Sequence, residues 1–215
     1  MIKSLVDLRG DFGSARDQDP RPTCMAFAAS DAHAAARDGW EPLSTEWAYY
    51  HALKRDGGLP HEGTTLDAML ATIKSDGQPV EAEWPYITAD ITDVKSWKPP
   101  APAKQLFFRD HNACPVTVQD IIDQLHAGTP VLITMKLSDA FYRPDADGVV
   151  ERNEPMDPKR HHAVVAVGHG QRGAAGFVLI RNSWGEAWGL KGHAWIAVDY
   201  LKPRLTGAAI MTTEP

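Results

Sequence analysis

A cysteine placed directly after two closely spaced prolines, and before an alanine-rich run, constrains the fold of this chain more than any other feature. Pro20 and Pro22 exclude a helix up to that point. Thr23 is a good N-cap, and the residues from Cys24 to Gly39 are predicted to form a helix. Cys24 therefore lies in the first helical turn, where unpaired N–H groups and the macrodipole are expected to lower the pKa of its thiol.

Cys24 by itself fits two interpretations. A single cysteine in an alanine-rich helix is most often a small buried hydrophobic residue. In the second interpretation the thiol is a nucleophile, and Gln18, on the loop that leads into the helix, directs amide donors at negative charge that develops beside the sulfur. Features near the far end of the chain favour the second interpretation.

The composition is that of an ordinary globular protein. With 215 residues, 43% of them hydrophobic and 23% charged, the chain is long enough for one large domain or two small ones. The net charge of −6 argues against a nucleic-acid-binding surface. No apolar run is long enough to span a membrane. Only two cysteines, Cys24 and Cys114, are present, so there is no disulfide framework and no Cys-rich metal pattern.

The first ten residues contain no hydrophobic region of the signal-peptide type. Together with the low cysteine content, this predicts a reducing compartment, most simply the cytoplasm. Export by a route that does not use a classical signal is compatible with the same sequence. We expect a monomer that needs no cofactor and no metal ion.

Capping residues, apolar stripes and glycine stops predict three helices in the first half of the chain. A Pro-rich irregular segment follows and is expected to form the passage between two lobes. The predicted segments are an extended strap over 1–17, a helix over 24–39, a helix over 44–54 capped by Ser44, a helix capped by Thr64 or Thr65 that ends at 77, and the irregular passage over 79–105.

The second half changes from helices to strands. A short helix capped by Thr117 and stopped by Gly128 comes first, and apolar runs rich in β-branched residues follow. The predicted strands cover 131–137, 163–168, 177–181, 193–198 and 208–212. Because helices come first and strands later, the fold class is expected to be α+β with segregated lobes.

A histidine and an asparagine lie at the ends of two of these strands. His162 opens the strand at 163–168, and Asn182 ends the strand at 177–181. A cysteine nucleophile needs a base to take its proton and a third group to orient that base. A hydrogen bond from the imidazole to the Asn182 side-chain carbonyl would fix the ring and its tautomer, and Trp184 would shield that bond from water.

Each of these residues has an ordinary structural explanation when it is considered alone. A histidine beside an apolar strand is usually structural, and an asparagine usually belongs to a turn. Zinc binding by His161, His162 and His169 is the alternative for the histidines, but no Cys/His spacing supports it. The combination in one chain, in a fixed order, favours chemistry.

Several stretches together resemble the papain-like cysteine proteases, in the order that the family has over nearly the whole chain. His162 and Asn182 lie roughly 140 and 160 residues after Cys24, near the range of about 130–150 in the family signature. The block Asn-Ser-Trp-Gly-x-x-Trp-Gly is the most specific of these stretches. The matching stretches are Val6-Asp7-Leu8-Arg9, Gln18 with Cys24 and Ala26-Phe27, Leu43-Ser44, Trp84-Pro85-Tyr86, His162-Ala163-Val164, and Asn182-Ser183-Trp184-Gly185 through Trp188-Gly189.

The resemblance implies a papain-like two-lobed α+β fold in a single domain over residues 1–215. A helical lobe of about 11–105 is followed by an antiparallel β-barrel-like lobe of about 106–215, and residues 1–10 cross onto that second lobe. The active-site cleft is expected between the two lobes.

The resemblance also implies a cysteine endopeptidase that works through an acyl-enzyme. Cys24 is then the nucleophile, His162 the acid and base, and Asn182 the orienting residue, while Gln18 and the Cys24 backbone N–H stabilise the oxyanion. The substrate is expected to be an extended peptide or protein segment. The expected substrate-binding residues are Gly63, Ile133, Met135, His161, Ala163 and Trp184, with Ile133 or Met135 on the floor of an apolar pocket that prefers a medium apolar residue at P2.

The chain departs from the family pattern around the nucleophile. Arg21 occupies the position of a disulfide cysteine, Pro22 replaces a glycine that lines the cleft, and Met25 replaces a large aromatic residue. The chain begins at the family's mature N-terminus, so we expect an enzyme that is active as translated, without a propeptide. Two alternative functions stay open: an acyltransferase or deamidase on the same triad, and a non-catalytic peptide-binding module.

Overall fold

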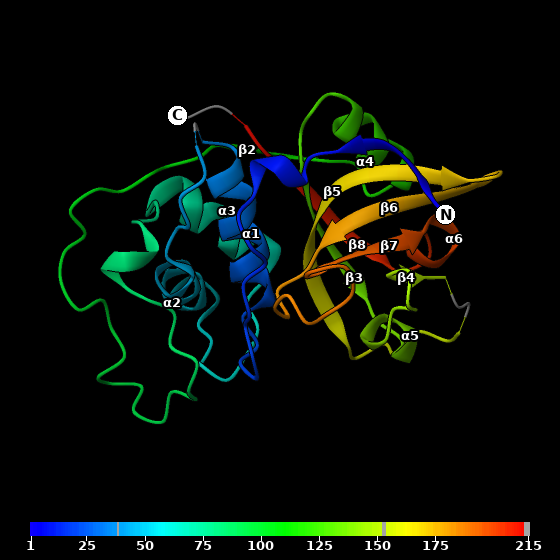
Figure 1. Cartoon of the computed structure of the whole chain (residues 1–215). Coiled ribbons are helices and arrows are strands. Elements are labelled where there is room, and N and C mark those ends of the chain that lie inside the picture. The colour runs from blue at the N-terminus through cyan, green and yellow to red at the C-terminus, as the bar shows by residue number, and fades with distance from the viewer. Residues whose placement is uncertain (38, 152–153, 213–215) are drawn as a thin grey trace.

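The computed structural model describes residues 1–37, 39–151 and 154–212. The longer helices α1 to α3 gather in one lobe, and the strands gather in the other (Figure 1). The helical lobe contains α1 (Cys24–Ala35), α2 (Thr45–Asp56), α3 (Leu66–Ser75) and the short 3-10 helix η2 (Glu81–Glu83). The remaining elements are β1 (Lys3–Asp7), η1 (Arg9–Asp11), β2 (His111–Ala113), α4 (Val118–His126), β3 (Val131–Lys136), α5 (Asp139–Tyr142), β4 (Val149–Val150), β5 (His161–Arg172), β6 (Ala175–Arg181), β7 (His193–Ala197), α6 (Val198–Leu201) and β8 (Leu205–Met211).

The strands of the described residues form one sheet in the order β2-β8-β3-β5-β6-β7-β4. Neighbours pair antiparallel except β4 and β7, which pair in parallel. The N-terminal strand β1 is not part of this order, and it pairs antiparallel with β5. The start of the chain therefore lies on the strand-rich lobe, although the helix that follows it belongs to the other lobe (Figure 1).

Both faces of the central strands are buried. On β5, Val165 belongs to the hydrophobic cluster that includes the helical lobe, while its neighbour Val164 belongs to the cluster inside the curved sheet. On β6, Leu179 and Ile180 divide in the same way. Strands that are buried on both faces read as continuous apolar runs, which is the pattern seen in the sequence of this half.

Helix α1 lies between the lobes and is buried along almost its whole length. Its many alanines, including Ala26, Ala29 and Ala34 without exposed surface, allow the neighbouring elements to approach closely. The helix ends at Ala35, earlier than the predicted end at Gly39. The i→i−3 hydrogen bonds of the Ala36 and Arg37 N–H groups tighten the last turn and end the helix there.

Three of the predicted helix starts are confirmed by side-chain caps. Ser44 Oγ accepts a hydrogen bond from the Trp47 N–H at 3.1 Å. Thr65 Oγ1 and Thr117 Oγ1 accept in the same way from residues three positions further along, each at 3.2 Å. Because each cap depends on two residues of one short segment, it was readable from the sequence.

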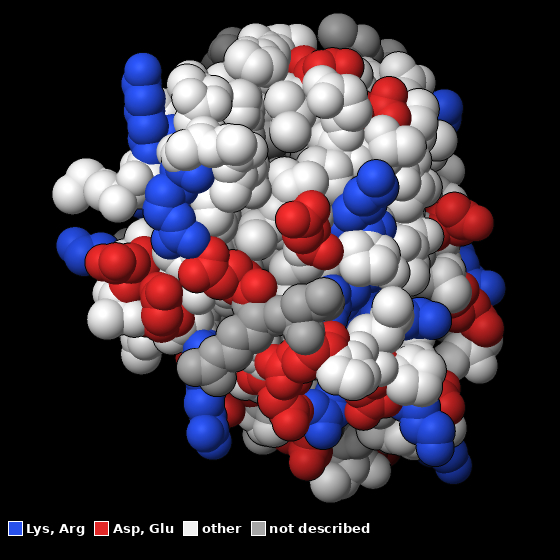
Figure 2. Space-filling view, turned by 90° about the vertical axis from the view of Figure 1, so that its right-hand side faces the viewer, with Lys and Arg blue, Asp and Glu red and all other residues white. Residues whose placement is uncertain are grey.

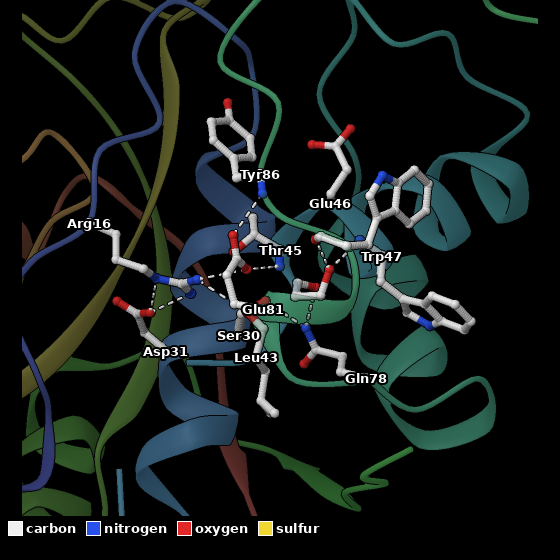
Figure 3. Close-up of polar contacts among 12 residues, drawn as sticks. Arg16, Ser30, Asp31, Leu43, Thr45, Glu46, Trp47, Gln78, Glu81 and Tyr86 are labelled. Atoms are coloured by element: carbon white, nitrogen blue, oxygen red, sulfur yellow. Dashed lines mark hydrogen bonds and ion pairs between the residues drawn. The ribbon is translucent and has the colours of Figure 1, made fainter. Parts of the chain in front are cut away.

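A polar network connects α1 with the loops of the helical lobe (Figure 3). Arg16 donates to Asp31 Oδ1 at 2.6 Å and lies 3.4 Å from Glu81 Oε2. Glu81 in turn accepts hydrogen bonds from the backbone N–H groups of Thr45 and Tyr86, at 3.1 and 2.8 Å. The network fixes the start of α2 and the irregular segment after η2 relative to α1, the helix that begins at Cys24.

The surface of the strand-rich lobe carries mixed charge. On the face seen in Figure 2, the described Lys and Arg side chains alternate with Asp and Glu, without a continuous basic region. Within the described ranges, every helix is too short or too polar to cross a membrane.

Candidate active site

A cavity of about 500 Å³ lies between the two lobes. Cys24 reaches it from the start of α1, and His162 reaches it from the start of β5. The residues that line the cavity are Gln18, Pro22, Cys24, Met25, Gly63, Thr64, Thr65, Leu66, Thr134, Leu137, Tyr142, Lys159, His161, His162, Ala163, Trp184 and Thr206. Cys24, His162 and Gln18, which are far apart in the sequence, therefore meet at one cleft.

Cys24 is the first residue of α1 and is partly exposed in this cavity. Thr23 stands at the N-cap position, but its side chain makes no cap hydrogen bond. Its hydroxyl instead lies 2.9 Å from the hydroxyl of Tyr86. No side chain therefore caps the N–H groups of the first turn, which remain beside the sulfur as donors.

Burial raises the pKa of the Cys24 thiol, and hydrogen bonds from the backbone N–H groups of Ala163 and Met25 only partly oppose this shift. The expectation of a lowered pKa is therefore wrong in direction. Desolvation of the thiolate raises the pKa by more than the backbone N–H donors lower it.

His162 and Asn182 form a short hydrogen bond, with 2.7 Å between His162 Nε2 and Asn182 Oδ1. Asn182 Oδ1 also accepts from the backbone N–H of Ser183 at 2.9 Å. A carbonyl oxygen only accepts hydrogen bonds, so Nε2 of a neutral His162 carries the proton and Nδ1 is the free basic nitrogen. Asn182 therefore fixes the tautomer that proton abstraction requires.

Aromatic rings enclose this hydrogen bond. The Trp184 ring centroid lies 4.8 Å from that of His162, and the Phe141 ring lies 5.6 Å away on a T-shaped approach. Burial lowers the pKa of His162 to about 4, against the opposing effect of the bond to Asn182. His162 is thus a neutral imidazole near pH 7, ready to act as a base.

The carboxamide of Gln18 is held at both of its atoms. Gln18 Nε2 donates to the carbonyl oxygen of Arg21 at 2.9 Å, and Gln18 Oε1 accepts from Ser183 Oγ at 2.7 Å. An amide nitrogen carries two hydrogens, so one N–H is left for the cavity that Gln18 lines. Gln18 and Cys24 line the same cavity.

Four of the predicted substrate-binding residues line the cavity: Gly63, His161, Ala163 and Trp184. Ile133 and Met135 do not, and neither side chain has exposed surface. They point into the interior of the curved sheet, so the prediction that one of them floors the pocket is wrong. Side chains alternate along a strand, and a shift of one residue exchanges the two faces.

Thr134 occupies the face that the sequence analysis gave to its neighbours. It pairs with Ala163 across β3 and β5, and its hydroxyl lies 2.9 Å from that of Thr206. A Cβ atom built on Gly207 would meet both Thr134 Oγ1 and Leu66 Cδ2, so Leu66 lies beside this pair. The one available signal was the single hydroxyl side chain in the apolar run Val131–Met135.

Tyr142, the last residue of the short helix α5, and Lys159, on the loop before β5, were also missed, because the sequence between β3 and β5 has no periodicity. The Tyr142 ring stacks on Trp184 at 5.1 Å between centroids and 16° between planes. Lys159 is exposed at the cavity edge.

His169 lies at the other half of β5 and packs against His126, away from His161 and His162. In the described part of the chain, no three His, Cys, Asp or Glu side chains are arranged to hold a metal ion.

Comparison with known proteins gives the same pattern. The profile described as papain family cysteine protease matches residues 54–210, a range that includes His162 and Asn182 and begins after Cys24. Similarity over the full range includes Cys24: the chain is 27% identical to a cathepsin L-like proteinase of Fasciola hepatica, over 100% of this chain and 65% of that protein. It is 23% identical to Peptidase 1 of Euroglyphus maynei, over 92% of this chain and 62% of that protein. The chain thus spans less than two thirds of the length of these relatives.

Solved structures show the same fold. Xylellain, a cysteine protease from Xylella fastidiosa, superposes with a TM-score of 0.82 at 19% identity, covering 100% of this chain and 88% of that one. The bromelain protease from Ananas comosus, solved in complex with the E64 inhibitor, superposes with a TM-score of 0.76 at 21% identity, covering 97% and 98%. The expected two-lobed α+β fold is therefore confirmed. Because the family profile matches residues 54–210, which is more than half of this chain, the chain belongs to the papain family of cysteine proteases.

Proposed function

We propose that this chain is a cysteine peptidase that hydrolyses peptide bonds through Cys24, His162 and Asn182. The hydrogen bond of 2.7 Å between His162 Nε2 and Asn182 Oδ1 carries the proposal, because it fixes a base in one tautomer. Cys24 and Gln18 line the same cavity as that base. A thiol, an oriented base and an amide donor around one cavity are the parts that acyl transfer to sulfur requires.

In the proposed reaction, His162 Nδ1 takes the proton of Cys24 Sγ while the sulfur attacks the substrate carbonyl carbon. The carbonyl π electrons move to the oxygen, which accepts hydrogen bonds from Gln18 Nε2 and the Cys24 backbone N–H. His162 then gives its proton to the leaving nitrogen as the C–N bond breaks. Water, deprotonated by His162, attacks the thioester, releases the acid and restores the thiol.

The proposed substrate is an extended peptide that runs along the cleft. Leu66, Thr134, Ala163 and Thr206 line one part of the cavity, and we take the space beside them as the proposed P2 depression. A medium side chain at P2 fills such a depression, and Leu66 and Ala163 supply apolar contacts for it in place of Ile133 and Met135. We keep a medium apolar residue as the proposed preference.

Both cysteines are free thiols, with Cys24 at the cavity and Cys114 buried in the strand-rich lobe. We propose that the chain works as a monomer in a reducing compartment such as the cytoplasm. Light scattering on the eluting protein, with and without reductant, tests the oligomeric state directly.

Cleavage profiling with a peptide library, analysed by mass spectrometry, tests the proposed activity. We expect fragments from the wild-type protein and none from Cys24→Ala. Adducts or one-dalton shifts without fragments would indicate acyl transfer or deamidation instead. Failure of a thiol-directed epoxide to label Cys24, together with an absence of products, would overturn the assignment of a nucleophile.

A further inference from the structure

Arg21 and Glu46 form a completely buried ion pair inside the helical lobe. Arg21 Nη1 lies 2.7 Å from Glu46 Oε2, and Arg21 Nη2 donates to Glu46 Oε1 at 3.0 Å. The Arg21 side chain is 1% exposed and that of Glu46 is 0% exposed. Arg21 occupies the position where the family resemblance implies a disulfide cysteine, and in this chain that position carries a charged pair.

The Glu46 carboxylate is held by donors from two further segments. Trp97 Nε1 donates to Oε1 at 2.6 Å, and the backbone N–H of Ile87 donates to Oε2 at 3.1 Å. Arg21 Nη1 also donates to the Ile87 carbonyl at 2.5 Å. A buried carboxylate with a full set of donors is a rigid anchor, because moving it leaves several polar groups unpaired.

The guanidinium is also fixed by aromatic rings. Its central carbon lies 5.3 Å from the Tyr49 ring centroid and 5.1 Å from that of Tyr86. The hydroxyl of Tyr86 donates to the Gln18 carbonyl oxygen at 2.7 Å. The side chain of Arg21 is therefore held by α2, by the irregular segment after η2, and by a ring that also touches the Gln18 backbone.

The backbone of Arg21 meets the proposed oxyanion donor. Its carbonyl oxygen accepts from Gln18 Nε2 at 2.9 Å and from the Thr23 N–H at 2.8 Å. One N–H of the Gln18 amide is thereby bonded to the Arg21 carbonyl oxygen. Because the amide group is planar, the direction of this bond determines where the second N–H points. A rotation of the Arg21 peptide would redirect the donor in the cavity. Displacement of an oxyanion donor by about 1 Å is enough to cost a large factor in rate.

We propose that Arg21, anchored by Glu46, is a positioning residue that sets the direction of the Gln18 amide. Arg21 does not touch the substrate, and it acts through Gln18 alone. The inference rests on the proposed function of Gln18 as an oxyanion donor. Buried ion pairs add little net stability over apolar replacements, so geometric specificity is the function that this pair serves here.

The test compares Arg21→Met with the neutral double variant Arg21→Met/Glu46→Gln, in which the glutamine oxygen still accepts from Trp97. Either variant serves if the other fails to fold. We expect kcat for a peptide substrate to fall by about 10- to 100-fold, with KM within about twofold of wild type. A peptide aldehyde, which adds the Cys24 sulfur to its carbonyl carbon and passes the thiol proton to the oxygen, should bind more weakly by the same factor.

Alkylation of Cys24 by iodoacetamide forms no oxyanion, so its rate should stay within about twofold of wild type. Arg55→Met is the matched control, because it removes a guanidinium from a partly exposed ion pair of the same lobe. This control should leave kcat, aldehyde binding and alkylation unchanged. An equal fall of alkylation and kcat in the Arg21 variants would show a general loss of structure and would overturn the proposal.

A double-mutant cycle with Gln18→Ala provides the decisive comparison. If Arg21 acts through Gln18, Arg21→Met should cause no further loss of kcat in the Gln18→Ala background. A full further loss in that background would reject the proposed route. Arg21→Lys keeps the positive charge but loses the paired guanidinium N–H donors that bond both Glu46 oxygens. It should therefore recover only part of the activity that Arg21→Met loses.

A readout without catalysis separates this inference from the proposed function. The side-chain amide signals of Gln18, assigned in ¹⁵N NMR spectra by their loss in Gln18→Ala, report the positioning itself. In the wild type we expect the two signals to differ widely in chemical shift, with the N–H that donates to the Arg21 carbonyl oxygen protected from exchange. In Arg21→Met both signals should shift, and that protection should be lost. If the wild type cleaves nothing but these signals change, the proposed function fails and the positioning stands. Unchanged signals refute the positioning.

Discussion

Arg181 on β6 and Asp31 on α1 join the two lobes through a buried ion pair, with 2.7 Å between Arg181 Nε and Asp31 Oδ2. Arg181 also donates to the carbonyl oxygens of Gly13 and Ser14, each at 2.7 Å. Since Arg181 directly precedes Asn182, and Asp31 lies on the helix of Cys24, the pair holds the two halves of the active site at a fixed separation.

The substitution Asp31→Asn should destabilise the protein strongly. It leaves the buried Arg181 and the partly buried Arg16 without their shared carboxylate, and breaking a buried pair in this way costs about 3–5 kcal/mol in the free energy of unfolding. Urea denaturation measures this loss. Asp76→Asn, which breaks a partly exposed pair with Arg55, should cost about 0–1 kcal/mol. Equal costs for the two variants would show that burial of the Asp31 pair is unimportant.

Stability should fall as the pH drops from 6.5 toward 4. Burial lowers the pKa of His33 to about 4, and it lowers that of His162 to the same value. The unfolded chain binds protons on these histidines in that window and the folded chain does not, so their contribution is complete above pH 6.5 and is lost as pH falls through 4. Each shift corresponds to roughly 3 kcal/mol.

Denaturation midpoints across this pH range measure the effect. His33→Gln should flatten the dependence, whereas His61→Gln, at an exposed position, should leave it as in the wild type. A wild-type free energy of unfolding that stays constant from pH 7 to pH 4 would contradict the assignment of these histidines as neutral buried groups.

Substitutions in the triad should differ in severity. Cys24→Ala should remove turnover almost completely, because no other thiol lines the cavity. Asn182→Ala should cost less, since orientation of His162 is one part of the effect, and each tenfold loss in kcat corresponds to about 1.4 kcal/mol of barrier. Single-turnover kinetics on a peptide from the library give both values. Wild-type activity in Cys24→Ala would mean that the nucleophile is misassigned.

The Thr134 and Thr206 hydroxyls should set the polarity of the proposed P2 depression. Replacing both threonines by valine keeps the shape and removes two polar groups. We expect kcat/KM for a leucine substrate relative to a serine substrate to rise by about fivefold, near 1 kcal/mol. Thr129→Val, outside the cavity, serves as the control. A ratio that does not change would place P2 elsewhere in the cleft.

Reductant should not lower the melting temperature. Cys24 and Cys114 are both free, and the position of a family disulfide is occupied by Arg21 in its pair with Glu46. Dithiothreitol should therefore leave the thermal melt unchanged while it preserves activity by keeping Cys24 reduced. A large drop in melting temperature on reduction would reveal a structural disulfide in the purified protein.

The caps, the strands and the Asn-Ser-Trp-Gly block were predictable because each depends on residues close together in the sequence. Ser44 caps the helix whose first turn contains Trp47, and Asn182 is part of a short specific block. Such local agreement between residue type and structure is what a sequence displays directly. The order of the predicted elements, with helices first and strands later, then indicated which part of the chain forms each lobe.

Two features were not predictable from the sequence: which side chains of β3 face the cleft, and the direction of the Cys24 pKa shift. Both depend on how the two lobes pack together. Both faces of β3 are buried, so apolar character does not distinguish Ile133, inside the sheet, from the cleft face at Thr134. The Cys24 pKa depends on how completely the opposite lobe covers the thiol. The Arg21–Glu46 pair joins residues from separate helical-lobe segments, and no local pattern signals it.

The pairing of β3 with β8 has a consequence for the newborn chain. Cys24 is made early, whereas Asn182 and the strand Leu205–Met211 are made late, at about 5–20 residues per second. For roughly ten to forty seconds, the ribosome therefore carries a polypeptide that has its sulfur but no assembled base. Under the proposed function, such a chain cannot cut its own unfolded segments or those of its neighbours. The proposed hydrolysis would begin only after β8 has been made and has paired with β3.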